Sequence, residues 1–98
     1  MLDPNAPLFD VPEHLRPEIL EVFLEEAGEL VNQIVNDFSA NNIAAVKLSA
    51  HKLKGSSASV GATEVTSLSR TIEHADIPNE TQVDQLQKAF IVIRDHLS

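Results

Sequence analysis

The chain has 98 residues, 43% of them hydrophobic, which is enough for one domain with a core and too little for two. Fifteen acidic residues against seven basic ones, and only four aromatic residues, all Phe, argue against nucleic acid or an anionic membrane as partner. There is no cysteine for disulfides or thiolate metal sites, and no apolar run approaches the ~20 residues that span a bilayer. A cytoplasmic monomer is the simplest expectation.

The first residues predict an arm, because prolines at positions 4, 7 and 12 discourage regular structure over residues 1–11. They include no basic residue, which does not fit a signal peptide. Residues 12–98 are expected to form the domain itself. A short helix is expected between Pro12 and Pro17, with Asp10 as its candidate cap.

Four longer helices follow in chain order, over about residues 17–38, 43–59, 62–75 and 80–97. Each shows apolar residues at spacings of three and four, and the last has a strict heptad at Val83, Leu86, Phe90, Ile93 and Leu97. Asn42 can cap the second helix, and Gly61 can end it in the left-handed conformation. The pattern predicts an all-α fold, an antiparallel up-down four-helix bundle with a short N-terminal helix or arm over one end.

One face of the second helix carries an unusual set of side chains. Projection at about 100° per residue places the apolar Val46, Leu53 and Val60 opposite His51, which therefore points to solvent. The face around His51 holds Ala44, Lys47, Leu48, Lys54, Gly55 and Ala58. Three lysines, at positions 47, 52 and 54, also fall in a stretch between Asp37 and Glu64 that contains no acid.

This face suits phosphoryl transfer to a histidine. The nucleophile has to be exposed, and Gly55, one turn further on, removes a side chain beside the imidazole despite the cost of glycine in a helix. Lys47 and Lys54 can offset the charge of about −2 that a phosphoryl group brings. The other interpretation is a solvated face with an inert histidine, and these residues by themselves leave both interpretations open.

Other chemistry lacks its spacing in this sequence. No histidine has a Glu three residues before it, as di-iron bundles require, and HExxH is absent. The stretch from Gly55 to Gly61 lacks the Gly-Lys-Ser/Thr ending of a phosphate-binding loop. We therefore expect no metal, no ATP site and no enzymatic activity of the chain's own.

Residues 50–57 read AHKLKGSS and residues 60–62 read VGA. This string resembles the signature of histidine-containing phosphotransfer (HPt) domains, roughly A-H-x-L-K-G-S-[SA] followed by a small hydrophobe and G-A, and the similarity covers about residues 12–97. The resemblance implies a four-helix bundle with a short N-terminal helix. It also implies that His51 is the phosphoacceptor, that Lys54 assists phosphate binding, and that Gly55 leaves room for the partner.

The partners that this resemblance implies are receiver domains of response regulators and hybrid sensor histidine kinases. Mg²⁺ is expected on the receiver, so the chain needs no cofactor. The predicted function is acceptance of a phosphoryl group on His51 from a receiver aspartate, and its transfer to another receiver aspartate in a two-component phosphorelay. The alternatives are a receiver-binding module of the same fold that is not phosphorylated, and a small enzyme built on a bundle.

Overall fold

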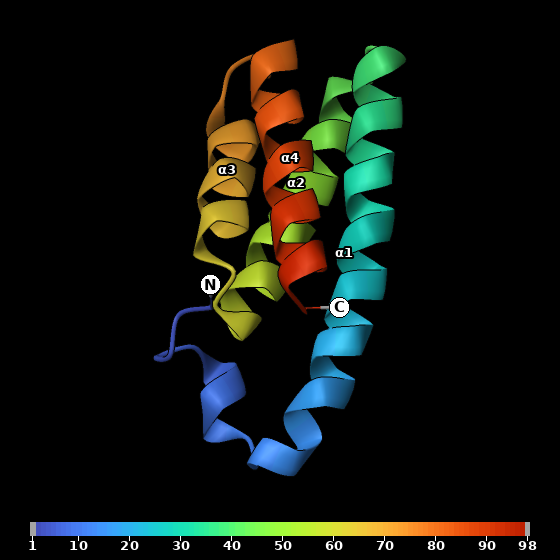
Figure 1. The fold of residues 1–98 in the computed structure, drawn as a ribbon. Helices are drawn as coiled ribbons and strands as arrows, with labels where there is room; N and C mark the ends of the chain where they lie inside the picture. The colour runs from blue at the N-terminus through green and yellow to red at the C-terminus, as the bar shows by residue number, and fades with distance from the viewer. Residues whose placement is uncertain (1, 98) are drawn as a thin grey trace.

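A computed structural model describes residues 2–97, and all regular elements in that range are helical (Figure 1). Met1 and Ser98, the outer ends of the expected arm and domain, lie outside the described residues. Two 3-10 turns come first, η1 (Pro7–Asp10) and η2 (Glu13–Leu15). The helices are α1 (Arg16–Ser39), α2 (Ile43–Val60), α3 (Thr63–His74) and α4 (Glu80–Leu97). The prediction of an all-α four-helix bundle is confirmed.

Short connections make successive helices antiparallel neighbours, and α4 returns to pack on α1. The bundle is therefore a closed ring of four helices in which α2 and α4 are diagonal, as Figure 1 shows with α2 behind α4. An outward-facing side chain on α2 and one on α4 consequently lie on opposite sides of the molecule.

The core is built from the apolar stripes that the sequence predicts, including Val83, Leu86, Phe90 and Ile93 of the α4 heptad. The buried face of α2 is wider than its three predicted residues, because Ser49, Ala50 and Ser57 are buried as well. These small side chains flank the stripe and allow α1 and α3 to approach α2 closely. The hydroxyl group of Ser57 and that of Thr66 on α3 form a hydrogen bond of 2.7 Å, so burial of this serine is compensated.

The predicted helix ends of α2 are confirmed. The Asn42 side chain accepts a hydrogen bond from the Ala45 amide at 3.3 Å, and Gly61 follows the helix with φ +81°. At α4, Asn79 and Gln82 each accept a hydrogen bond from the other's backbone amide, which is the reciprocal arrangement of a capping box.

The N-terminal arm packs across the α2–α3 end of the bundle. Leu8 is buried in the core, and the Asp3 amide donates to the Gly61 carbonyl at 2.8 Å. The Arg16 guanidinium donates to the Phe9 carbonyl at 3.1 Å and the Val11 carbonyl at 3.0 Å, which holds the arm against the start of α1.

Two expectations for the arm were wrong. The arm is not free of regular structure, since Pro7 begins η1; a proline there loses no hydrogen bond because the first amides of a helical turn have no partner. Asp10 does not cap the following turn, because it is the last residue of η1 and Pro12 precedes η2.

The positive φ of Gly61 generates a stability prediction. A Cβ at this position would lie 2.7 Å from the backbone nitrogen and oxygen of Asp3, so Gly61→Ala is expected to lower the free energy of unfolding by at least about 1–2 kcal/mol. Gly28→Ala is the control, because its Cβ would meet only the Phe90 ring at 3.5 Å and should stabilise α1 by up to ~1 kcal/mol. Denaturant unfolding of both variants checks the signs; equal effects would contradict the role given to Gly61.

Candidate functional site

His51 lies in the middle of α2 with its side chain 62% exposed, while Leu53 on the opposite face is fully buried. The predicted orientation of the imidazole is confirmed. Leu48 is 57% exposed on the same side of the helix. The small residues predicted for this face are also exposed, namely Ala44, Gly55 and Ala58.

Glu73, in the last turn of α3, connects the two polar side chains of the site. Its Oε2 lies 2.5 Å from His51 Nδ1, and its Oε1 accepts a hydrogen bond from Lys54 Nζ at 2.5 Å. One carboxylate therefore holds both the imidazole and the ammonium group. The side chains of Lys54 and Glu73 are 24% and 17% exposed, so this pair is better shielded from water than the imidazole.

The bridge determines which ring nitrogen of His51 can react. An ionised carboxylate only accepts hydrogen bonds, so Nδ1 must carry the proton that Glu73 receives. In the neutral imidazole this leaves the lone pair on Nε2. No group within residues 2–97 hydrogen-bonds Nε2, which is therefore an exposed nitrogen nucleophile in a fixed tautomer.

The electrostatics of the site keep Glu73 in the ionised form. The hydrogen bond from Lys54, and after it the interactions with His51, hold the pKa of the Glu73 carboxyl below its ordinary value despite partial desolvation. At neutral pH the carboxylate is thus available as the acceptor for Nδ1–H.

Sequence reasoning missed Glu73, because it considered the faces of single helices. The Ser57–Thr66 hydrogen bond fixes the register of the α2–α3 hairpin. His51 lies six residues before Ser57 on α2, and Glu73 lies seven residues after Thr66 on α3. In this register the two side chains lie opposite each other. An antiparallel α2–α3 hairpin with its turn at residues 61–62 would have predicted that Glu73 lies opposite His51. The part of α2 that contains no acidic residue therefore still has a carboxylate beside it in the fold, that of Glu73 on α3.

Lys47 and Lys54, predicted to flank His51 together, have different surroundings. Lys54 Nζ is held beside the imidazole by Glu73, whereas Lys47 Nζ donates to the backbone carbonyl of Asp76 at 3.2 Å. Lys47 thus connects α2 to the segment between α3 and α4. His74, for which no site-like surroundings were expected, lies with Nε2 3.7 Å from Glu73 Oε1, but it projects from α3 and is 67% exposed.

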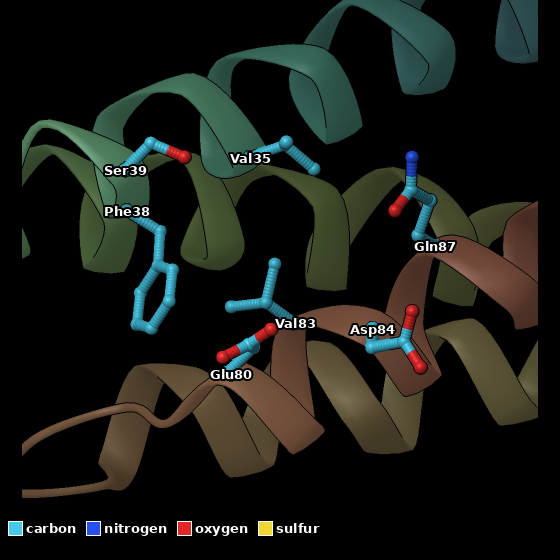
Figure 2. Close-up of a pocket in the computed structure, with 7 residues that line it drawn as sticks. All are labelled: Val35, Phe38, Ser39, Glu80, Val83, Asp84 and Gln87. Atoms are coloured by element: carbon cyan, nitrogen blue, oxygen red, sulfur yellow. The ribbon is translucent and has the colours of Figure 1, made fainter.

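A hollow of about 460 Å³ lies elsewhere, between the end of α1 and the start of α4 (Figure 2). Its lining combines apolar, acidic and neutral polar side chains, which are Val35, Phe38, Ser39, Glu80, Val83, Asp84 and Gln87. None of the residues predicted for the site takes part in it. The His51 imidazole instead lies on an open surface.

A family model, described as the Hpt domain, matches residues 18–97. The chain therefore belongs to the Hpt domain family, whose members carry phosphoryl groups in two-component phosphorelays and are phosphocarriers rather than enzymes. Members interact with response-regulator receiver domains and histidine kinases. Searches of curated proteins and of solved structures gave no match.

Two further observations concern residues 2–97. None of the helices there combines the length and the apolar character that a bilayer crossing requires. Nor does that part of the chain bring three His, Cys, Asp or Glu side chains together in a way that could hold a metal ion.

The Glu73 bridge predicts the tautomer and reactivity of His51. Glu73→Ala should release Nδ1–H and slow reaction with the small donor phosphoramidate about tenfold, the rate equivalent of losing one hydrogen bond to a charged group. Glu73→Gln retains an acceptor oxygen and should lose less. Nitrogen NMR of the imidazole, with Glu64→Ala in the first turn of α3 as control, measures this; an unchanged tautomer and rate in Glu73→Ala would remove Glu73 from the site.

Proposed function

We propose that His51 Nε2 accepts a phosphoryl group from the aspartyl phosphate of one receiver domain and passes it to the aspartate of another. The Nε2 lone pair attacks phosphorus, the bond from phosphorus to the aspartate oxygen breaks, and the electron pair stays with the carboxylate. No proton has to leave the imidazole, because the one it carries remains on Nδ1 beside Glu73. The observation that carries this proposal is an exposed imidazole whose Nδ1 is hydrogen-bonded to a carboxylate, which leaves Nε2 as the nucleophile.

The other side chains of this face have supporting roles in the proposal. Lys54 stabilises the phosphoryl charge, since its ammonium already lies on the side of α2 that holds the imidazole. Mg²⁺ belongs to the receiver, which brings it together with the aspartate. The small side chains of Ala44, Gly55 and Ala58 leave a low surface on which the receiver approaches Nε2, and Leu48 contributes an exposed apolar side chain to the same face. The same step run in reverse passes the phosphoryl group from Nε2 to the aspartate of a second receiver.

The proposal is tested by mixing the protein with a receiver domain carrying labelled aspartyl phosphate. The wild-type chain should gain a label that is labile in acid and stable in base, as a phosphohistidine is. His51→Gln should gain none while keeping its helical spectrum and melting temperature, because the side chain faces solvent. Variants of His14, His74 and His96 should label normally; label retained in His51→Gln would refute the assignment.

Gly55 separates docking from reactivity. A Cβ here would meet nothing within 4 Å, so Gly55→Gln should preserve or raise the melting temperature, replacing a glycine in mid-helix. Its side chain should nevertheless obstruct the receiver and cut transfer at least about tenfold, ~1.4 kcal/mol of barrier. Labelling by phosphoramidate should persist, because that donor is small. Unimpaired transfer from the receiver would place the docking face elsewhere.

A further inference from the structure

The most exposed large apolar side chain in residues 2–97 is Ile77, which is 76% accessible to solvent. It lies in the five-residue connection between α3 and α4. Single exposed apolar residues are common on protein surfaces, so exposure alone carries no meaning. Ile77 differs from other exposed apolar residues in two ways: contacts hold the residues on both sides of it, and the segment lies beside His51.

The connection is fixed on both sides of Ile77. On one side, the Asp76 carbonyl accepts the hydrogen bond from Lys47 Nζ at 3.2 Å. On the other side Pro78 is fully buried, and Asn79 forms the reciprocal cap with Gln82. Ile77 is therefore presented to solvent by a backbone segment that is held at both ends, so that binding through it would lose little conformational entropy.

The segment lies beside the proposed site. Lys47 is one helical turn before His51 on the same face of α2, a rise of about 6 Å, and its side chain reaches the residue next to Ile77. A standard protein interface of ~800 Å² per partner corresponds to a disc with a radius of roughly 16 Å. An interface of that size centred on His51 extends beyond Lys47 toward Asp76 and Ile77, and it also covers Leu48, the exposed apolar residue adjoining Lys47.

We infer that Ile77, together with Leu48, is an apolar anchor for the receiver domain, which has to present an apolar patch beside its phosphoaccepting aspartate. Lys47 acts as a positioning residue, since its ammonium holds the segment that carries Ile77. This inference rests on the proposed function and adds to it a second helix connection as part of the docking surface. The phosphoryl step itself is unaffected, because the hydrocarbon side chain of Ile77 has no group that could hydrogen-bond or neutralise a phosphoryl oxygen.

Ile77→Ser tests the anchor, with Val92→Ser as its matched control. Val92 is 65% exposed on α4, the helix diagonal to α2, so both changes remove one exposed branched apolar side chain. Transfer from a phosphorylated receiver is measured over a range of protein concentrations. Ile77→Ser should raise the half-saturating concentration about tenfold and leave the maximal rate and phosphoramidate labelling unchanged. Val92→Ser should behave as the wild type.

Lys47→Met tests the positioning role, because it removes the ammonium group and keeps an unbranched side chain that is only one atom shorter. It should weaken receiver binding in the same way as Ile77→Ser, and the double variant should be little worse than either single one. Additive effects would show that Lys47 acts independently of Ile77 and overturn its positioning role, and slower phosphoramidate labelling in Lys47→Met would assign Lys47 to the phosphoryl group.

The outcomes also separate the inference from the proposed function. If the wild type labels on His51 but Ile77→Ser has the half-saturating concentration of Val92→Ser, the anchor alone is refuted. If the wild type accepts no label from receiver or phosphoramidate, the proposed function fails and the inference with it. If sedimentation finds a wild-type dimer that Ile77→Ser dissociates, Ile77 is a contact between copies of this chain, and the anchor is again refuted.

Discussion

The packing of α2 against α3 sets the geometry on which both the core and the site depend. Two small buried residues, Ala50 and Ser57, lie on the flank of α2 that faces α3, and the Ser57–Thr66 hydrogen bond fixes how far the helices are shifted along each other. In that register the last turn of α3 reaches the middle of α2. A shift by one helical turn, about 5.4 Å, would separate the Glu73 carboxylate from His51.

Small side chains occur on both the buried and the exposed side of α2, for different reasons. On the inner flanks, small side chains allow two neighbouring helices to approach closely. On the outer face, Ala44, Gly55 and Ala58 are exposed and have small side chains, which in the proposed function lets the receiver domain approach. Gly55 costs the helix some intrinsic stability and fills no structural need, since the space around its Cα is open. In the proposed function, its position is explained by access of the receiver domain to the imidazole.

Much of the fold could be predicted because amphipathic periodicity reports the burial of each position within one helix. The orientation of His51, the left-handed ending at Gly61 and the α4 heptad all follow from such local patterns. The partners of Lys47 and Glu73 could not be predicted in this way. Each depends on the register between helices or on the course of the α3–α4 connection, which is set by packing between segments distant in sequence. The arm was predicted to lie over one end of the bundle. Its 3-10 turn was not predicted, because the prolines indicated an absence of regular structure.

The arm also bears on where the folded unit begins. The family match starts at residue 18, yet Leu8 fills part of the core and the Asp3 amide donates a hydrogen bond to the Gly61 carbonyl. Gly61 immediately follows the helix that carries His51. A fragment trimmed to the family boundaries would expose this end of the core to water. It would also remove the N-terminal segment that covers the turn between α2 and α3. In this protein the minimal unit that preserves the site is therefore longer at its N-terminus than the family boundaries indicate.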